Sequence, residues 1–381
     1  MTLMINDIAD VINISVSNPA ESEYDIFVGL EHYDVGEPII TRYGSTKMLT
    51  TACKKFSAGD ILLARRNVYL RRAGLVKFNG LTSGDSIVIR IKPNLSIEGV
   101  NSQEISRLLP FVLNTNAFWD FANTNSDGTM SKRLSPQMLL SYEFNLPPFS
   151  NQKPLADKLW AAYSLKASKL KLIDAIDEMV KSQFIEMFGT CNDPKAAVET
   201  LGSICDVQRG GSPRPISDYI TDDPEGLNWI KIGDTDDSMY ITCTEEKIKS
   251  SGLRKTRQVH AGDLLLSNSM SFGRPYILAI DGCIHDGWLV LHFDQNKIHP
   301  VYLCSYLSQA TTYCELSKLA AGGVVNNLNK EIVKVLPTLV PKIDSQKQFV
   351  NIVEQADKSK FELKRSIEAI DKVIKSLINN I

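Results

Sequence analysis

The sequence has few cysteines, and their spacing excludes the common zinc modules. None of them forms a C-x-x-C pair, and no Cys/His cluster has zinc-finger spacing. We therefore expect reduced thiols in a cytoplasmic protein and no structural metal. The seven cysteines are Cys53, Cys191, Cys205, Cys243, Cys283, Cys304 and Cys314.

Long apolar runs are also missing, and we do not expect residues 1–17 to be a secretory leader. No run approaches the roughly 20 residues that a membrane span needs. Residues 1–17 include Asp7 and Asp10, and they lack the basic stretch and apolar core of a signal peptide. We expect no membrane partner.

Catalytic motifs are absent or incomplete. There is no G-x-x-x-x-G-K-[ST] phosphate loop, and no Ser or Cys nucleophile motif accompanies the histidines. Residues 145–149 nearly match the N-P-P-[YF] motif of amino-methyltransferases, but Leu146 interrupts it and no glycine-rich turn for a methyl donor is evident. A proline at the start of a helix is the simpler interpretation of Pro147.

A few residues match the pattern of a metal-dependent nuclease site only loosely. Asp236 or Asp237 followed by Glu245-x-Lys247 could hold Mg²⁺ and orient water. The first half of the chain has no equivalent acidic cluster, which disfavours this interpretation. We expect a non-catalytic chain without a resident cofactor, and keep a solitary Mg-dependent endonuclease or a methyltransferase as the alternative.

Charge of one sign does not dominate the molecule. Charged residues make up 23% of the chain and balance to a net charge of −2, so any DNA binding must come from local patches. At 381 residues with 43% hydrophobic composition, the chain can fill two or three compact cores.

The chain contains a tandem repeat. Pro147, Gln152 and the tripeptide 175–177 recur 194 positions later, at Pro341, Gln346 and 369–371. Upstream, Ala-Gly-Asp at 58–60 recurs at 261–263, and Ile8 to Val11 resembles Ile204 to Val207. Each copy is therefore a divergent front followed by a better matched tail.

Each tail predicts one long helix. Apolar positions advance by alternating steps of four and three residues, which is a heptad seam, and Lys166 and Lys360 interrupt it at equivalent places. A helix of about 38 residues would be roughly 57 Å long. We expect the two tails to pair antiparallel. Alternatively, the lysine stems only extend outward from helices that face a core.

The fronts predict mixed α/β units. Short apolar runs separated by Gly, Pro, Asn and Asp are typical of strands. Residues 103–113 and 301–317 are typical of helices. Each front should therefore be a twisted sheet with packed helices. The fold class is α/β (mixed α+β) with an internal pseudo-two-fold repeat. The predicted boundaries are 1–145 and 191–336 for the globular units and 146–190 and 337–381 for the helices.

Positive charge concentrates in the first unit at residues 65–77, which hold five basic residues and no acid. Arginine can chelate guanine edges or contact phosphates, and Asn and Tyr can read or stack on bases. A solvated charged hairpin is the alternative. The predicted DNA contacts are Arg65, Arg66, Asn67, Tyr69, Arg71 and Arg72.

The second unit offers different polar loops. Residues 208–215 form a loop shaped by glycine and proline, whose small residues allow close backbone approach. Residues 267–274 occupy the position that the basic cluster at 65–77 has in the first unit, and their polar side chains can contact base edges. A polar loop also precedes each long helix, suited to phosphate contact or to helix capping. The predicted contacts are Arg209, Ser212, Arg214, Ser267, Asn268, Ser269 and Arg274, with Lys132 and Arg133 in one polar loop and Asn326 and Asn327 in the other.

Taken together, these features resemble the specificity (HsdS) subunits of type I restriction–modification systems. The resemblance lies in two divergent units, each followed by a helix that begins with Pro-x-x-x-x-Gln-Lys, and in residues 208–215, 229–234, 267–275 and 284–288. It spans the chain and is weakest over residues 1–55. It adds Lys231 to the predicted DNA contacts.

The resemblance implies a DNA-binding subunit that reads a two-part site with an unread gap, its halves about one helical turn, roughly 34 Å, apart. It implies two methyltransferase subunits on the helices and possibly two restriction subunits, with S-adenosylmethionine, ATP and Mg²⁺ bound only by these partners. A coiled-coil interaction protein without a nucleic-acid role is the third class of function.

Overall fold

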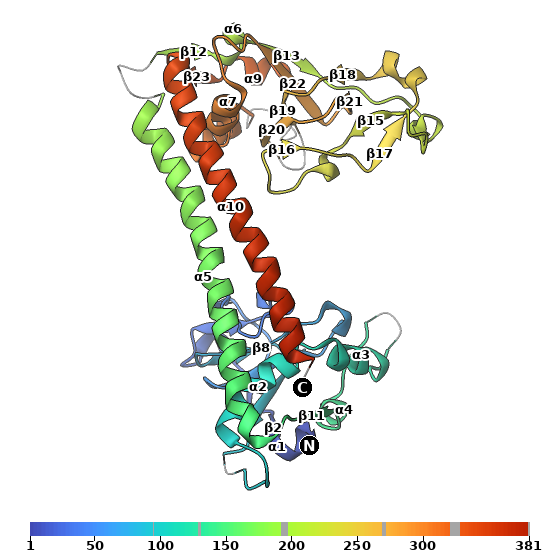
Figure 1. Ribbon diagram of the computed structural model, residues 1–381, viewed down its shortest axis with the longest axis vertical. Coiled ribbons are helices and arrows are strands. Elements are labelled where there is room, and N and C mark those ends of the chain that lie inside the picture. The colour runs from blue at the N-terminus through green and yellow to red at the C-terminus, as the bar shows by residue number, and fades with distance from the viewer. Residues whose placement is uncertain (94, 129–130, 192–196, 269–271, 321–327, 380–381) are drawn as a thin grey trace. The chain divides into compact units, whose positions relative to one another are not determined.

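The computed structural model describes residues 1–93, 95–128, 131–191, 197–268, 272–320 and 328–379. The chain divides into two compact units. Unit 1 comprises Met1–Leu170 and Lys364–Ile381, and unit 2 comprises Lys171–Leu363. Both units contain sheets, short helices and part of each of the two long helices (Figure 1). Within the described ranges, no helix has the length and apolarity that crossing a membrane requires.

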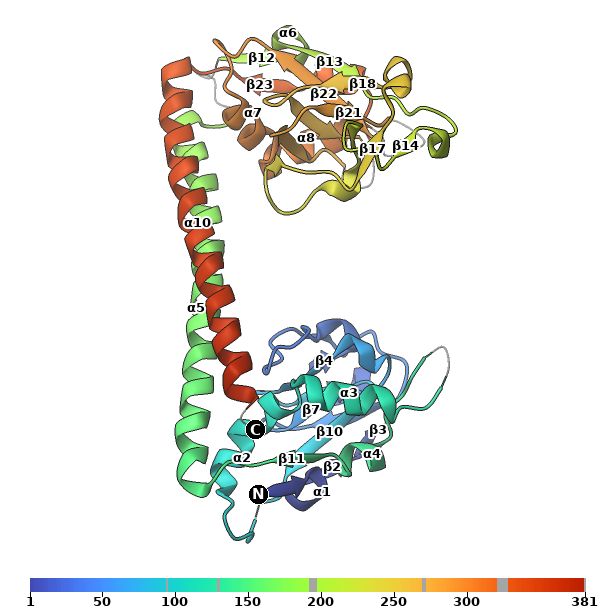
Figure 2. The same ribbon diagram turned by 45° about the vertical axis from the view of Figure 1, so that its right-hand side comes forward.

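Unit 1 is built on a four-stranded antiparallel sheet in the order β2-β10-β7-β8 and a five-stranded sheet in the order β3-β6-β9-β4-β5. Helices α2 and α3 lie beside strands β7 and β10 (Figure 2). The elements are β1 (Thr2–Met4), α1 (Ile5–Ile8), β2 (Ala9–Ile12), β3 (Ser15–Val16), β4 (Ile26–Val28), β5 (Gly44–Ser45), β6 (Cys53–Phe56), β7 (Ile61–Ala64), β8 (Ala73–Leu75), β9 (Gly80–Thr82), β10 (Ser86–Ile91), α2 (Ser102–Val112), α3 (Asn116–Thr124), α4 (Pro136–Leu140), β11 (Glu143–Asn145) and α5 (Phe149–Phe188), which continues into unit 2.

Unit 2 repeats this plan with sheets in the orders β13-β22-β19-β20-β16 and β14-β17-β15-β21-β18. Each unit places one parallel strand pair in its second sheet, β4 with β9 and β15 with β21. The elements are β12 (Val198–Thr200), α6 (Leu201–Ile204), β13 (Cys205–Arg209), β14 (Ile220–Thr221), β15 (Leu227–Ile230), β16 (Tyr240–Ile241), β17 (Glu246–Ile248), β18 (Arg257–Val259), β19 (Leu264–Ser267), β20 (Pro275–Leu278), β21 (Gly282–Ile284), β22 (Trp288–Phe293), α7 (Pro300–Leu307), α8 (Ala310–Ala320), α9 (Lys330–Lys334), β23 (Pro337–Leu339) and α10 (Ile343–Ile378).

The central strands are apolar throughout because they are buried on both faces. In β7, Ile61 and Leu63 pack with the helices, whereas Leu62 and Ala64 pack with the second sheet. Strand β19 follows the same alternation, with Leu265 on the side of the second sheet. Successive side chains of a strand point to opposite faces, so a strand between two layers must be apolar at every position.

The repeated Ala-Gly-Asp tripeptide forms the turn before each of these strands. Gly59 and Gly262 both have φ of +93°, a left-handed conformation that glycine adopts without strain. The following carboxylate closes the turn, since Asp60 accepts the Ser57 N–H at 2.7 Å and Asp263 accepts its equivalent at 2.8 Å. The motif is therefore structural in both units.

The repeated glutamine fixes the start of each long helix. The Gln152 amide is fully buried; its oxygen accepts the Asn101 N–H at 2.9 Å, and its nitrogen donates to the carbonyls of Gly99 and Pro147. Buried amides need such partners, and one side chain here satisfies three backbone groups. Gln346 repeats the arrangement with the His299 N–H and the carbonyls of Lys297 and Pro341. Pro147 thus belongs to the structure that begins a helix, as its repeat suggested.

Within each unit, α5 and α10 pack side by side and antiparallel. In unit 1 the Lys166 ammonium lies 3.0 Å from an Asp371 carboxylate oxygen, and in unit 2 Lys360 lies 2.9 Å from Asp177. These two pairs are equivalent in the repeat, because each lysine and each aspartate recurs 194 positions later. The lysines therefore bind carboxylates across the seam instead of extending into solvent.

Lys166 also bonds to a residue of the unit 1 sheets. Its ammonium lies 2.9 Å from a Glu37 carboxylate oxygen. Burial opposes the lysine charge, but the carboxylates of Glu37 and Asp371 outweigh burial and raise the pKa of Lys166. In unit 2 the second partner of Lys360 is Asp357, on α10 itself. At this position Lys166 connects the helix pair to the sheets of unit 1. The equivalent Lys360 connects the two long helices of unit 2 to each other.

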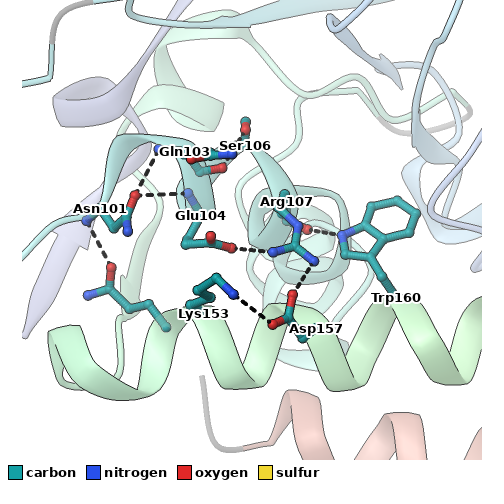
Figure 3. A network of polar contacts seen from close by, with 9 residues as sticks. Asn101, Gln103, Glu104, Ser106, Arg107, Lys153, Asp157 and Trp160 are labelled. Carbon is teal, nitrogen blue, oxygen red and sulfur yellow. Dashed lines mark hydrogen bonds and ion pairs between the residues drawn. The ribbon is translucent and has the colours of Figure 1, made fainter.

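A polar network attaches α2 to α5 in unit 1 (Figure 3). The Arg107 guanidinium lies 2.6 Å from the buried Glu104 carboxylate and 2.7 Å from Asp157 on α5. Trp160 of α5 donates its indole N–H to the Arg107 carbonyl at 3.0 Å. Lys153 adds a 3.4 Å contact to Asp157.

Aromatic rings form the matching attachment in unit 2. Phe184 of α5 lies against Tyr302 of α7 and Phe349 of α10, with ring centroids 5.5 and 5.3 Å apart. Tyr302 donates its hydroxyl to the Leu339 carbonyl at 3.0 Å, and burial raises the pKa of this phenol. Phe188 also packs on Tyr302 and Phe349.

Candidate nucleic-acid interface

In unit 1, the predicted basic cluster forms the connection between β7 and β8. Its centre is a single 3-10 turn over Val68–Leu70, flanked by Asn67 and Arg71, whose φ angles of 55° and 51° are left-handed. Val68 is buried and anchors the turn, whereas the side chain of Tyr69 is 60% exposed. The connection is thus a loop of defined conformation between two antiparallel strands, and a charged hairpin without a DNA role stays the alternative.

The second predicted loop of unit 1 packs directly on the first. Arg66 donates its Nε–H to the Ser131 hydroxyl at 2.9 Å, and the Asn67 N–H donates to the Lys132 carbonyl at 2.8 Å. The Leu134 N–H donates to the Arg65 carbonyl at 2.9 Å. Two segments about 65 residues apart in sequence therefore form one surface.

One carboxylate organises the arginines of this surface. Asp85 lies 3.6 Å from an Arg66 nitrogen and 3.4 Å from an Arg133 nitrogen. Both guanidinium groups stay nearly half exposed, and a single carboxylate cannot neutralise two of them. The surface keeps excess positive charge, which suits phosphate contact. Asp85 lies outside the predicted clusters, and nothing in its local sequence indicated this role.

Other arginines of the cluster are committed to the protein itself. Arg72 donates to the carbonyls of Leu30 and Arg66, and burial lowers the pKa of its guanidinium. Arg71 donates to the Asn116 side chain at 2.7 Å. Lys132 donates to the Asn123 carbonyl at 3.0 Å. We infer that Arg71 and Arg72 hold the loop in shape while Arg66 and Arg133 face solvent.

In unit 2, the predicted loops converge on Asp286. Ser212 donates its hydroxyl to the Asp286 carboxylate at 2.7 Å, and an Arg214 nitrogen lies 3.5 Å from the other oxygen. Arg209 and Asn268 both donate to the Asp286 backbone carbonyl, at 3.0 and 2.8 Å. The Ser212 hydrogen bond is the main reason that the pKa of Asp286 is lowered. Asp286 lies in a segment quoted for the resemblance but was not predicted as a site residue.

The glycines of the 208–215 loop permit close approach to the protein's own backbone. A Cβ on Gly210 would lie 2.1 Å from the His285 carbonyl oxygen, and one on Gly211 would lie 2.9 Å from the Lys255 carbonyl oxygen. Any side chain at Gly210 would therefore displace the loop. The close approach inferred from the sequence is real, but the partner seen is the adjacent loop.

Arg214 and Lys231 both line a pocket of about 720 Å³ in unit 2. Trp229 and His285 contribute to its wall, and the Lys231 ammonium lies 2.9 Å from a Glu246 carboxylate oxygen. Both ring nitrogens of His285 face backbone N–H groups, and burial lowers the pKa of this imidazole. His285 is therefore neutral near pH 7, and the positive charge at the pocket comes from Arg214 and Lys231.

The loop predicted from residues 267–274 is largely internal where it is described. Ser267 and Asn268 are 0% and 3% exposed, and the Ser267 hydroxyl accepts the Arg274 N–H at 3.0 Å. Arg274 lies over the Tyr276 ring and donates to the Asp236 carbonyl. Ser267 and Asn268 therefore support the loop, because a buried polar group is held by its partners, whereas the Arg274 side chain stays 44% exposed. Ser269, Asn326 and Asn327 lie outside the described residues.

The nuclease-like residues do not form a metal site. Lys247 donates to the Pro224 carbonyl at 2.6 Å, and the Asp236 carboxylate accepts the Ser238 N–H. Throughout the described ranges, no group of three His, Cys, Asp or Glu side chains is placed to hold a metal ion.

Comparison with known proteins agrees with this architecture. Residues 195–371 match the family model of the type I restriction modification DNA specificity domain. The fold is similar to a chain of a type I R-M system studied for complex assembly and conformational transition, with 17% identity, 100% and 96% of the two chains covered and a TM-score of 0.59. It is also similar to the type I restriction–modification S subunit from M. genitalium, with 12% identity, coverage of 99% and 94%, and a TM-score of 0.55.

Proposed function

We propose that this chain is a specificity subunit of a type I restriction–modification system and that each unit reads one half of a two-part DNA site. The match of residues 195–371 to the type I restriction modification DNA specificity domain supports this proposal. Unit 1 would use the surface formed by residues 65–72 and 131–134, and unit 2 the loops gathered around Asp286. The observation that carries the proposal is this convergence, in each unit, of separate polar loops into one surface that keeps exposed arginines.

The exposed arginines suit two kinds of DNA contact. A planar guanidinium can bind the O6 and N7 of guanine in the major groove or bridge phosphate oxygens. Arg66 and Arg133 in unit 1 and Arg214 in unit 2 retain exposed side chains for this purpose. Since the two surfaces differ in residues and shape, the two half-sites should differ in sequence.

We propose that catalysis resides in separate partner subunits. The chain would recruit two methyltransferase subunits and possibly two restriction subunits, and these would bind S-adenosylmethionine, ATP and Mg²⁺ in the cytoplasm of a prokaryotic cell. Exposed apolar side chains on the long helices, including Leu165 in unit 1 and Met179 and Phe361 in unit 2, support a protein partner there.

Genome-wide mapping of methylated adenines, with and without this gene, tests the proposal. We expect methylation at a two-part sequence with an unread gap, lost when the gene is removed. An unchanged methylation pattern would contradict a specificity role. The purified chain should also leave plasmid DNA unmodified and uncut when given S-adenosylmethionine or Mg²⁺, and turnover by the chain alone would favour the solitary enzyme.

An exchange of residues 195–336 for the corresponding part of another specificity subunit tests the modular assignment. We expect one half of the methylated sequence to change while the other half and the gap stay the same. If both halves changed, the two units would not read DNA independently.

A further inference from the structure

Two adjacent side chains on the unit 1 surface are left in solvent although one is aromatic and one aliphatic. Tyr69 is 60% exposed and Leu70 is 37% exposed, while their neighbour Val68 is 1% exposed. The single turn that carries them therefore has an internal anchor and an apolar outer tip. Leaving both tips in water forgoes the favourable transfer that burial would give, which suggests that they are covered when a ligand binds.

The turn that presents these side chains is held at both ends in a costly conformation. Asn67 and Arg71 have φ of 55° and 51°, a region that residues other than glycine seldom adopt. Such conformations persist where surrounding contacts enforce them, and they concentrate at functional sites. Here the Asn67 N–H donates to the Lys132 carbonyl, and the Arg71 guanidinium donates to Asn116. Tyr69 and Leu70 are thus presented on a preformed support.

The surroundings of the turn indicate the kind of ligand. The guanidinium groups of Arg66 and Arg133 remain exposed on the same surface and share one carboxylate. A patch in which two apolar tips stand beside two guanidinium groups that share a single carboxylate does not fit an apolar protein partner. It fits a polyanion that also offers flat, apolar faces, which is the chemistry of stacked base pairs between phosphate backbones.

We propose that Tyr69 and Leu70 form a wedge that enters one base step of the first half-site. The ring of Tyr69 would stack on the opened base, Leu70 would fill the gap, and the adjacent arginines would hold the flanking phosphates. Wedges of this kind unstack a step and bend the duplex, which adds sequence preference through the ease of deformation. This inference rests on the proposed function, since it assumes that unit 1 binds DNA.

The test uses the full chain alone, so that no methyltransferase can extrude a base. Duplexes carry the mapped target with 2-aminopurine at one position of the first half-site at a time, and dyes at both ends report bending by energy transfer. We expect increased 2-aminopurine fluorescence at one step and a shortened end-to-end distance. The double variant Tyr69→Ala, Leu70→Ala should lose both signals and bind about 10-fold more weakly.

Two further variants separate stacking from general surface effects. Tyr69→Phe keeps the ring and should keep both signals. Met48→Ala removes an exposed apolar side chain from another loop of unit 1 and should change neither signal. Tyr69 and Leu70 are exposed and lie outside the core, so circular dichroism should show that the double variant folds like the parent.

Three outcomes would count against the wedge. Fluorescence that stays low at every step with the parent chain, or stays high with the double variant, would overturn the inference while leaving specific binding intact. Equal binding to the target and to a scrambled duplex would overturn the proposed function itself, and the wedge with it.

Discussion

The attachment of the long helices to the globular fronts differs between the two units, although the repeat began from one sequence. Unit 1 adds to an edge-to-face contact of Phe111 with Trp160 an ion network in which Arg107 bridges Glu104 and Asp157. Unit 2 uses aromatic rings around Phe184, which stacks on Tyr302 and meets Phe349 edge to face. The buried glutamine at the start of each helix is the same in both. The repeat has kept the group that satisfies backbone hydrogen bonds and has exchanged the packing around it.

The difference has a physical basis. A buried amide with three backbone partners has few substitutes, because any smaller group leaves those partners unsatisfied. Packing can be rebuilt from other side chains provided that the volume is filled. Ion pairs and rings should also respond differently to salt and pH, which allows the two attachments to be distinguished by experiment.

Removing the central ring of the unit 2 attachment should have the largest effect. Phe184→Ala leaves a cavity among Tyr302, Phe188 and Phe349, and we expect a loss of about 3–5 kcal/mol in the free energy of unfolding of unit 2. Urea unfolding in low and high salt measures it. The loss should not depend on salt, and a salt-dependent loss would mean that the attachment is not principally apolar.

Removing either glutamine should cost roughly 3 kcal/mol, because backbone groups around it lose their partners in a buried site. Gln152→Ala and Gln346→Ala should destabilise units 1 and 2 by similar amounts, measured by the same denaturation. Gln152→Glu and Gln346→Glu are controls that keep the size of the side chain. We expect them to be destabilised as well, because a carboxylate cannot donate to the two carbonyls. A large difference between the two alanine variants would contradict the equivalence of the two joints.

Replacing the exposed arginines of unit 1 should weaken DNA binding and spare stability. Arg66→Ala with Arg133→Ala should reduce affinity through the first half-site by about 10-fold, with an unchanged second half-site. Competition binding with duplexes mutated in one half measures this. The matched change in unit 2 is Arg214→Ala, which should affect only the second half. Unchanged affinity would remove these arginines from the interface.

Acid should loosen the unit 1 attachment slightly and leave the unit 2 attachment alone. The Arg107 guanidinium is the main reason that the pKa of Asp157 is lowered in the folded protein. A lowered carboxyl pKa contributes stability above the ordinary value of 3.8, and this contribution is lost as the pH falls through the folded pKa. Asp157→Asn should remove that acid dependence of unit 1 unfolding, monitored by hydrogen exchange of the unit 1 amides, and an unchanged pH profile would exclude the pair as its source.

Much of the architecture could be predicted because it depends on patterns along the chain. The offset of 194 residues located both long helices and the equivalent lysines, and the apolar runs located the central strands. The candidate site was predictable only in part. Loops 65–72 and 131–134 were both identified, but their contact through Ser131 was not, because hydrogen bonds between distant segments leave no local signal.

Residue type alone overstated what several polar residues can offer to DNA. Ser267 and Asn268 are buried, and Arg72 is held by two carbonyls, although all three sit in polar segments of the sequence. Conversely, Asp85 and Asp286 organise the two surfaces, although an acid is an unexpected residue in a DNA interface. Which side chains remain available depends on neighbours that are far away in sequence.

The duplication, the heptad helices and the two-sided burial of the central strands follow from periodicity and apolar content, which act locally and repeat along the chain. The folded molecule alone reveals which arginines stay exposed, which carboxylates hold them, and that Tyr69 and Leu70 stand on a preformed turn. Those features depend on contacts between segments that folding brings together, and such contacts are set by packing in three dimensions.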